Sequence, residues 1–461
     1  MERRWKVLIV AAVAVFMGFL DVTIVNVAFP DIERDFADAS QADLSWVLNA
    51  YNIVFAALLV PAGRLADVLG RRRMFFVGVW VFLVASVLCG LAPAPGWLVA
   101  ARVLQAVGGA ILVPTSLSLL LPEFPTERRA TAVSIWSATG AVAAAVGPSL
   151  GGVLVDTLDW RWVFFVNVPI GLAAIVPARR LLVETREPGG ELPDVLGTVL
   201  LIAGVGVLAL GIVKGEQWGW GSARVLGSLA AGMVLLAGVV VRSLRHGAPV
   251  VDVELFRVRS FAVANAGMFS FSLAFYALLL ANVLFMTGVW GYSILHAGVA
   301  VTPGPIMAAL SAPIGGALSD RFGQRVVAFP GALFFAAGCV LFATGLEADR
   351  AYWPHFLIPT LLTGIGVGLS FAAWGSAAVA ELPPARFATG SAVLACLRQI
   401  GAVLGIAGLV AVLAAAPPGD PLAGVTEAYT LMTIAALCTA GLALALGRVR
   451  SLAAAPIPEA V

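Results

Sequence analysis

The sequence Gly63-Arg-Leu-Ala-Asp67-Val-Leu-Gly70-Arg-Arg72 returns in the second half of the chain as Gly316-Ala-Leu-Ser-Asp320-Arg-Phe-Gly323-Gln-Arg325. A shorter pair, Arg128-Arg-Ala-Thr131 and Arg386-Phe-Ala-Thr389, recurs at nearly the same separation. Each copy of the first motif follows a long apolar segment, and each copy of the second begins one. Because both pairs occupy equivalent places, the chain is predicted to consist of two related halves.

The segments around these motifs have the composition of a membrane protein. Of the 461 residues, 61% are hydrophobic and only 12% are charged, whereas soluble domains carry about 25% charged residues. A helix needs about 20 mostly apolar residues to cross a bilayer. The chain is therefore predicted to be an all-α integral membrane protein with fourteen spans, near residues 7–31, 42–63, 73–93, 97–121, 128–155, 160–180, 194–213, 223–243, 260–287, 294–319, 325–346, 353–379, 386–414 and 427–447.

Basic residues are divided unevenly between the two sides that these spans define. Most of the 28 lysines and arginines fall at the start of the chain or in loops that follow even-numbered spans. Cytoplasmic loops carry such an excess, so the protein is predicted to cross the plasma (inner) membrane many times with both termini in the cytoplasm. The first apolar run is too long for a signal peptide, which predicts an uncleaved first helix.

Two ionisable residues are predicted to lie deep in the membrane. Asp21 is the only charged residue in the stretch from Val7 to Pro30, and a carboxylate within a span usually marks a proton or substrate pathway. The structural alternative is a carboxyl that is protonated or capped by a neighbouring helix. Arg102 shares a helix face with Gln105 and needs a carboxylate, water or dipoles around it. Two arrangements remain open: an Asp21–Arg102 ion pair, or a neutral Asp21 in an apolar site.

Longer motifs resemble those of the major facilitator superfamily, and specifically its fourteen-span drug:proton antiporter family, over nearly the whole chain. Leu20–Pro30 resembles the first-span signature of that family, and Trp160–Gly171 resembles the start of its sixth span. Gly63–Arg73 is similar to the cytoplasmic loop motif of the superfamily, except that Val68 replaces a basic residue. Arg102–Gly109 is similar to its fourth-span motif.

Four residues of the fifth span resemble the antiporter motif of that family: Gly147, Pro148, Gly151 and Gly152. The proline removes a backbone hydrogen bond and permits a bend, and the glycines allow close contact with another helix. Ordinary helix packing would also explain these residues. Ala143 replaces a glycine of the longer pattern, which is a mild change because alanine is also small.

The resemblance implies a bundle of two pseudo-symmetric six-helix halves, at 1–180 and 260–461, with two inserted helices and their linkers at 181–259. It implies a carrier, not an enzyme, that expels small lipophilic or cationic compounds such as drugs and antibiotics in exchange for protons by alternating access. An uptake or facilitative carrier of another solute on the same fold is the alternative. The expected partners are a small-molecule substrate, protons and the lipid bilayer, without nucleic acid, and the expected functional unit is a monomer.

Proton coupling is assigned to Asp21 and Arg102, because a carboxyl whose surroundings change as the halves move can take up and release a proton. No cofactor is expected. The only lysines, Lys6 and Lys214, stand outside any Gly-Lys-Ser/Thr nucleotide loop, so the predicted energy source is the proton gradient and not ATP. No metal site is predicted, since the three histidines and four cysteines form no cluster with ligand spacing.

The repeated loop motifs are predicted to form a conformational lock. The resemblance implies that Asp67 contacts the start of span thirteen near Arg386, where the positive end of the helix dipole favours a carboxylate, and that Asp320 does the same at span five. These contacts would favour the outward-open state. A solvated turn whose arginines only set the topology is the alternative. The residues of the predicted lock are Gly63, Asp67, Gly70, Arg71, Arg72, Asp320, Arg321 and Arg386.

A substrate cavity is predicted from polar and aromatic residues within the spans. Apolar walls with few polar anchors suit amphipathic molecules. Arg398 either faces the cavity or extends toward the cytoplasm, being about four turns into span thirteen. No further carboxylate is predicted deep in spans seven to fourteen, which argues against dicationic substrates. The predicted cavity residues are Asn26, Tyr51, Asn52, Gln105, Trp136, Asn265, Tyr276, Trp374 and Arg398.

Overall fold

The computed structural model describes residues 2–124, 129–186, 192–247, 249–382, 386–417 and 421–446. All regular secondary structure in these ranges is helical. Thirteen segments are helices long and apolar enough to cross a membrane. A further helix, α6 (Arg129–Thr157), has 29 residues, more than the roughly 20 that a span needs. With α6 included, the predicted fold class, an all-α membrane bundle with fourteen spans, is confirmed.

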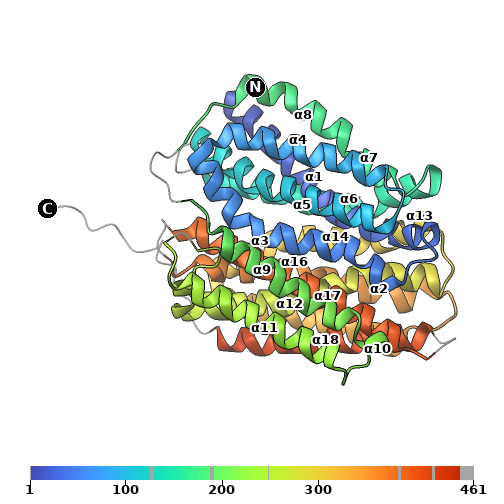
Figure 1. Ribbon diagram of the computed structural model, residues 1–461. Coiled ribbons are helices and arrows are strands. Elements are labelled where there is room, and N and C mark those ends of the chain that lie inside the picture. Colours follow the sequence, from blue (N-terminus) through green and yellow to red (C-terminus); the bar gives the residue numbers. More distant parts are fainter. Residues whose placement is uncertain are drawn as a thin grey trace.

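The N-terminal half is built from long helices, with short ones at its turns (Figure 1). α1 packs against α6 and α5, and α5 also contacts α3 and α4. The bounds of these elements are α1 Arg3–Asp35, α2 Gln41–Leu44, α3 Trp46–Leu69, α4 Arg71–Gly90, α5 Pro95–Leu120, η1 Leu121–Glu123, α6 Arg129–Thr157, α7 Trp162–Phe165 and α8 Asn167–Leu181.

The C-terminal half repeats this pattern of helix contacts. α12 packs against α17 as α1 packs against α6, and α16 contacts both α14 and α15 as α5 contacts both α3 and α4. The bounds are α12 Arg259–Gly288, α13 Ile294–Val301, α14 Pro303–Phe322, α15 Gln324–Gly345, η4 Trp353–Leu357, α16 Ile358–Val379, α17 Phe387–Ala415 and α18 Pro421–Ala445.

The inserted helices lie beside the line along which the halves meet. α9 contacts α3 of the first half and α17 of the second, and the largely exposed α11 packs on α9. Asp194 caps α9 by accepting the N–H of Gly197 at 2.9 Å, and it also accepts a hydrogen bond from Arg242 of α11 at 2.8 Å. One carboxylate therefore joins the two helices. The bounds are α9 Val195–Val213, α10 Gly215–Trp218, α11 Ala223–Ser243 and η3 Val253–Arg257.

The two copies of the repeated motif end α3 and α14 with the same turn. Gly70 follows α3 with a φ of 112°, and Gly323 follows α14 with a φ of 92°. Residues with a side chain rarely adopt positive φ, so glycine is favoured at both positions. Each turn leads directly into the next long helix, α4 or α15.

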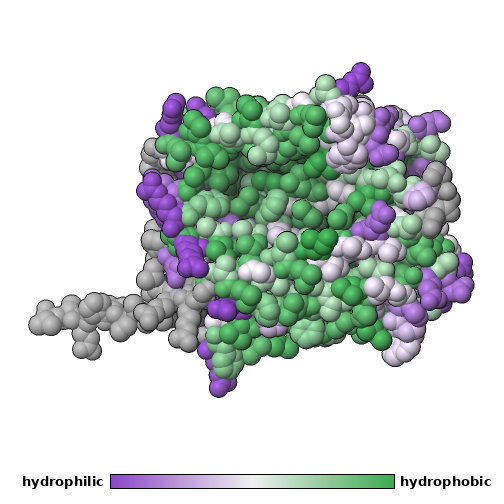
Figure 2. Space-filling view, turned by 90° about the horizontal axis from the view of Figure 1, so that it is seen from below, coloured by the Kyte–Doolittle hydropathy of each residue, from purple (hydrophilic) through white to green (hydrophobic). Residues whose placement is uncertain are grey.

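Charged residues gather at the two ends of the bundle and leave an apolar belt between them, as Figure 2 shows for one face. One end carries Arg3, Arg71, Arg179 and Arg242 and is called the arginine-rich end below. The opposite end, called the far end, carries salt bridges such as that between Asp43 and Lys214. An apolar belt with polar ends is the surface that a bilayer requires.

Several helices of the two halves meet at the far end. One hydrophobic cluster there joins α1 to α12, α13, α15 and α18. Toward the arginine-rich end, two clusters are each confined to one half: one takes its residues from α1, α4, α5, α6 and α8, and another from α12, α15, α16, α17 and α18. A further cluster joins the halves along one side of the bundle, through α3, α9 and α17. The structure is therefore closed between the halves at the far end.

Candidate functional site

A buried ion pair lies in the interior of the N-terminal half. Asp21 of α1 and Arg102 of α5 are 0% and 1% exposed, and Oδ2 of Asp21 lies 2.5 Å from Nη1 of Arg102. The other carboxylate oxygen, Oδ1, accepts hydrogen bonds from Gln105 Nε2 at 2.7 Å and from Asn167 Nδ2 at 3.3 Å. Of the two arrangements that the sequence leaves open, the structure holds the direct pair.

The Arg102 guanidinium is surrounded by groups that replace its water. Its Nε donates to the carbonyl oxygen of Val47 at 3.1 Å, and its Nη1 donates to Gln105 Oε1 at 2.6 Å. Its central carbon lies 4.0 Å from the ring centroid of Tyr51, within the range of a cation–π interaction. Because arginine keeps its proton even when buried, these contacts and Asp21 together stabilise the charge.

Two residues of this network have no role in the sequence-based prediction. Ser86 of α4 accepts a hydrogen bond from Gln105 Nε2 at 2.9 Å, and Asn167 of α8 reaches Asp21. Asn167 lies within the Trp160–Gly171 motif, and its place in that motif could have identified it as a functional residue. Ser86 is an isolated hydroxyl in an apolar helix and gives no such signal. Five helices, α1, α3, α4, α5 and α8, therefore position the pair.

The charge of Asp21 is compensated only while α1 and α5 keep their present positions. Both carboxylate oxygens already accept hydrogen bonds from Arg102, Gln105 or Asn167. Three donors therefore share the carboxylate, and Arg102 is the only one of them that carries a positive charge. Withdrawing the two charges from water costs several kcal/mol for each ion, which their mutual attraction must offset. A displacement of α5 relative to α1 would therefore separate the two charges and leave each without its partner.

A second buried polar group joins the two halves. The Tyr276 hydroxyl of α12 donates to Gln399 Oε1 of α17 at 3.0 Å, and Gln399 Nε2 donates to Asn52 Oδ1 of α3 at 3.2 Å. Asn52 and Tyr276 are predicted cavity residues, and the structure brings them together. Gln399 is absent from the predicted set, although it follows Arg398 directly in the sequence.

Arg398 lies beside this group and is directed between the halves. Its guanidinium carbon lies 5.8 Å from the ring centroid of Phe19 on α1 and 6.0 Å from that of Phe371 on α16. Its Nε is buried and has no hydrogen-bond partner. Phe19 is two residues from Asp21, so Arg398 is at membrane depth and does not extend to the arginine-rich end. Within the described part of the chain, no carboxylate forms a salt bridge with it.

The remaining predicted cavity residues lie elsewhere. Trp136 of α6 donates to Ser116 Oγ of α5 at 3.1 Å, inside the N-terminal half. Asn265 and Trp374 are fully buried among the helices of the C-terminal half. Asn26 donates to a carbonyl of its own helix, α1, at 2.6 Å. The structure does not bring these four residues to the group around Arg398, and their contact with substrate stays a prediction.

The small residues of the antiporter motif bring α6 close to α1. A Cβ built on Gly151 would lie 2.8 Å from Ile24 Cγ1, which is closer than real Cβ atoms approach. One built on Gly147 would collide with the hydroxyl of Thr23. Both glycines are therefore needed for the close packing of α6 on the helix that carries Asp21.

The same motif also contacts the other half at the far end. A Cβ on Gly152 would lie 2.8 Å from the Cα of Leu295 in α13, and a Cβ on Gly298 of α13 would collide with the carbonyl oxygen of Pro148. α6 and α13 thus touch backbone to backbone. We call this contact, formed by Pro148, Gly152, Leu295 and Gly298, the far-end seal.

The predicted lock residues make local contacts in this structure. Asp67 pairs with Arg71 at 2.7 Å, one helical turn away. Arg386 lies 3.7 Å from Asp252 and 3.8 Å from Glu254. Asp67 and Arg386 therefore have other partners here, and a contact between them stays a prediction for another conformation.

Not every predicted lock residue is described by the structure. The side chain of Asp320 lies outside the described residues, and so does Arg128, at the start of span five where Asp320 was predicted to bind. Arg321 places its guanidinium over the ring of Phe322, 5.1 Å from the centroid. Gly63 packs against Pro114 of α5, since a Cβ there would meet that proline at 3.5 Å.

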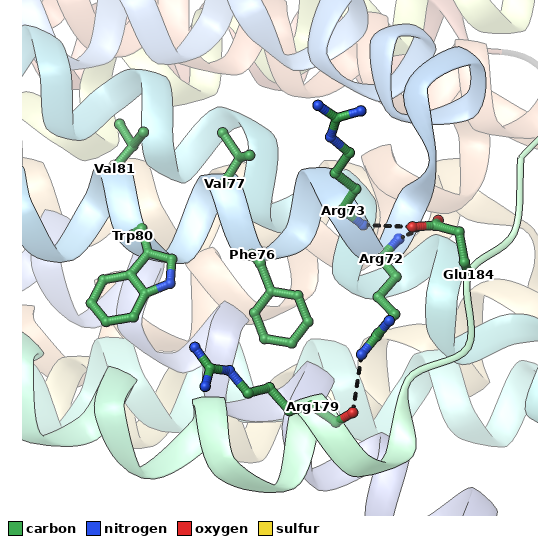
Figure 3. A pocket seen from close by; sticks show the side chains of 8 residues that line it. All are labelled: Arg72, Arg73, Phe76, Val77, Trp80, Val81, Arg179 and Glu184. Carbon is green, nitrogen blue, oxygen red and sulfur yellow. Dashed lines mark hydrogen bonds between the residues drawn. The ribbon is translucent and has the colours of Figure 1, made fainter.

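The arginines of the first motif join α4 to α8 (Figure 3). Glu184, in the segment after α8, accepts the backbone N–H groups of Arg72 and Arg73, both at 3.0 Å, and so caps α4. The Arg72 side chain donates to the carbonyl oxygen of Arg179 at 3.1 Å. This part of the motif is therefore held within the N-terminal half. Among the described residues no group of potential metal ligands is found.

Comparison with known proteins places these features in a family. The family model described as Major Facilitator Superfamily matches residues 11–251 and 264–459. The chain is 34% identical over 409 residues to the "Multidrug resistance protein Stp" of Mycobacterium tuberculosis (strain CDC 1551 / Oshkosh), covering 88% of this chain and 75% of that protein. It is 35% identical over 419 residues to the "Tetracenomycin C resistance and export protein" of Streptomyces glaucescens, covering 91% and 77%. It is 35% identical over 412 residues to the "Puromycin resistance protein pur8" of Streptomyces alboniger, covering 88% and 81%.

A solved structure has the same overall fold. It is the crystal structure of a bacterial homologue of the human lysosomal transporter Spinster in an inward-facing and unoccupied conformation, with a TM-score of 0.67 and 18% sequence identity over 97% of each chain. At that identity the likeness concerns the fold alone. The family model covers most of the chain and the relatives exceed 30% identity, so this chain belongs to the major facilitator superfamily.

Proposed function

We propose that this protein exports small lipophilic compounds in exchange for protons, by alternating access between its two halves. The observation that carries the proposal is the buried Asp21–Arg102 pair, since intramembrane charges of this kind mark proton or substrate pathways. Relatives named as resistance and export proteins, covered over most of their length, support export as the direction.

The arrangement suggests how the exchange proceeds. In the present structure, which is closed at the far end, the Asp21 carboxylate is paired with Arg102. When the halves rock and open the far end, α1 and α5 shift, Arg102 withdraws, and a proton binds Asp21. Return to the present conformation restores the pair and releases the proton on the other side. Substrate leaves while the protein is open at the far end, so one cycle moves the compound and the proton in opposite directions.

The orientation follows from the distribution of charge. The arginine-rich end would face the cytoplasm, with both termini there, because cytoplasmic loops are enriched in basic residues. The present conformation is then closed on the side of the membrane away from the cytoplasm. The membrane potential supplies about 2.3 kcal/mol per charge per 100 mV, so transport needs no ATP and no other cofactor. The repeated halves supply the moving parts within one chain, which makes a monomer sufficient.

The test is a compound-driven proton flux in proteoliposomes. The purified protein is reconstituted with a trapped pH-sensitive dye, and cationic, neutral and anionic compounds are added across an imposed pH gradient. Wild type is compared with Asp21→Asn and with Asp31→Asn. Asp31 is on the same helix but lies at the far end and pairs with Arg34 at 3.1 Å, so it is the matched control.

The expected result is proton flux with at least one compound in wild type and Asp31→Asn, and none in Asp21→Asn. Compound binding should survive in Asp21→Asn. Coupled flux that persists in Asp21→Asn would remove the assigned proton site. Compound movement that accompanies no proton movement would favour a facilitative carrier on the same fold instead.

A further inference from the structure

Arg398 carries a positive charge that the described residues leave uncompensated. Asp21, the other side chain at this depth that could attract it, is already paired with Arg102 at 2.5 Å. The Arg398 guanidinium makes cation–π contacts with Phe19 and Phe371, which contribute about 0.5–2 kcal/mol, and no salt bridge with any described residue. The side chain is half-buried, and a charge that is partly withdrawn from water is stabilised further by a counter-ion. The interior between the halves is therefore positively charged.

The contacts of Arg398 combine an ionic anchor with flat apolar walls. Phe19 comes from α1 of one half and Phe371 from α16 of the other, and both rings are partly exposed. The buried Nε of Arg398 has no acceptor, and the guanidinium fork matches carboxylate or sulfonate geometry with two parallel hydrogen bonds. An aromatic acid would satisfy both features, because its ring can stack on a phenyl face while its anion meets the fork.

We propose that Arg398, with Phe19 and Phe371, forms the binding site for the transported compound, and that the preferred cargo is an aromatic anion. This inference rests on the proposed export function and names its substrate class. Cations are disfavoured by the same charge, since Asp21 is neutralised by Arg102 and offers them no free carboxylate. Contacts from both halves mean that the site changes when the halves rock, as a transported ligand requires.

An anionic cargo also changes the energetics of export. With a negative interior potential, moving an anion outward is favourable by about 2.3 kcal/mol per 100 mV. Exchange of one anion for a given number of protons moves one more charge than exchange of its neutral analogue for the same number of protons. Anion export should therefore depend more steeply on membrane potential than export of the neutral analogue.

The test uses three probes with one aromatic frame: naphthoate, naphthylmethanol and naphthylmethylammonium, all substituted at the same ring position. Their equilibrium binding is measured by isothermal titration calorimetry on the full chain in lipid nanodiscs, with empty nanodiscs as the blank. Wild type is compared with Arg398→Gln, which removes the charge, and with Arg398→Lys, which keeps it without the planar fork. Thermal unfolding checks that each variant is folded.

Wild type should bind naphthoate at least tenfold more tightly than either analogue. Arg398→Gln should lose this preference through weaker naphthoate binding while its affinity for naphthylmethanol stays within about twofold. Arg398→Lys, which remains informative if the glutamine variant does not fold, should keep a reduced preference for naphthoate. An equal or higher wild-type affinity for the ammonium probe would overturn the proposal, as would an undiminished naphthoate preference in Arg398→Gln.

The proposal and the export function fail in different ways. If naphthoate binds as expected but drives no proton flux in proteoliposomes, the anion site stands and the export function fails. If neutral or cationic compounds drive flux equally in wild type and Arg398→Gln, and naphthoate shows no preference, export stands and the anion site fails.

Discussion

Oδ2 of Asp21 and Nη1 of Arg102 lie 2.5 Å apart, although the residues are separated by 81 positions in the sequence. Both side chains are withdrawn from water, so each charge depends on the other. The salt bridge between Asp35 and Arg161 at the far end differs in this respect. Its 2.9 Å separation is similar, but its side chains are 41% and 31% exposed, and water already stabilises both charges. Although the two salt bridges have similar lengths, removing one partner should destabilise the protein far more at the buried pair than at the exposed one.

The first prediction concerns the stability of the buried pair. Arg102→Gln should lower the free energy of unfolding by about 3–5 kcal/mol, because an uncompensated carboxylate is left in the interior. The double variant Asp21→Asn/Arg102→Gln should be more stable than Arg102→Gln alone, since no charge is then stranded. Unfolding in detergent by heat or denaturant measures both. Asp35→Asn should change stability by no more than about 1 kcal/mol.

A double variant that is less stable than Arg102→Gln would contradict this account. It would mean that the stability of this site depends on the hydrogen bonds of Gln105, Asn167 and Ser86 and not on the compensation of charge. The comparison is informative because these three residues remain in every variant, so only the charges differ.

The second prediction concerns the far-end seal. Gly298→Ala should weaken the contact of α6 with α13, because the added methyl group would collide with the carbonyl oxygen of Pro148. The protein should then spend more time open at the far end. Spin labels placed on α2 and α10 or on α7 and α13 can report this as a longer distance in pulsed electron resonance. Transport should slow, since the closed conformation is needed in each cycle.

Gly408→Ala is the matched control for the far-end seal. Gly408 is also a helical glycine, in α17, but a Cβ there meets no atom within 4 Å. The substitution should leave the distance distribution unchanged and should, if anything, stabilise the helix by a fraction of 1 kcal/mol. A distance shift as large as that of Gly298→Ala would show that the effect is not specific to the α6–α13 contact.

Much of the fold could be predicted because bilayer physics limits the choices. Spans must be helical and about 20 residues long, and the repeated turns at Gly70 and Gly323 mark equivalent places in each half. The membership of the Asp21 network was also partly foreseeable, since Arg102 and Gln105 share one face of α5. Ser86 could not be found in this way, because a lone hydroxyl in an apolar helix usually bonds to its own backbone, and Ser86 does so as well.

The cavity was harder to predict than the ion pair. Asn265 and Trp374 have the residue types of ligand contacts, but they face the interior of the C-terminal half. Periodicity indicates that a face is buried without indicating which helix covers it. Asn52 and Gln399 meet across the halves only because α3 packs against α17, and that choice of partner depends on the tertiary arrangement of all the helices.

The third prediction is that Asp67 and Arg386 come together when the far end opens. Here Asp67 pairs with Arg71, and Arg386 lies near Asp252 and Glu254. Cysteines at positions 67 and 386 should form a disulfide when the far end is open and not in the present conformation. The reaction is followed by gel mobility with and without Gly298→Ala. This substitution should raise the yield of the disulfide, because it favours the conformation that is open at the far end. Cys438, the only exposed native cysteine among the described residues, is first replaced by serine.

A disulfide yield that Gly298→Ala leaves unchanged would separate the lock from the far-end seal. The two would then not be alternative contacts of one rocking motion. A second cysteine pair, at positions 35 and 161, provides the opposite control. It joins two segments of the N-terminal half that are already in contact, so its yield should not respond to the state of the seal.

The fourth prediction concerns pH and the inserted helices. Burial by itself raises the pKa of Asp194, but the hydrogen bond from the Gly197 N–H and the guanidinium of Arg242 outweigh it, and the pKa lies below its ordinary value. A carboxyl with a lowered folded-state pKa adds stability that is fully present above its unfolded value, about 3.9, and that is lost as pH falls through the folded value.

Asp194→Asn keeps the cap of α9 but loses the charge. It should therefore be less stable than wild type by roughly 1 kcal/mol from pH 5 to 8, and the difference should shrink below about pH 4. Unfolding measured at both ends of this range checks the sign. If the stability difference between wild type and Asp194→Asn instead grows on acidification, Asp194 is stabilised in its protonated form and Arg242 does not stabilise the carboxylate.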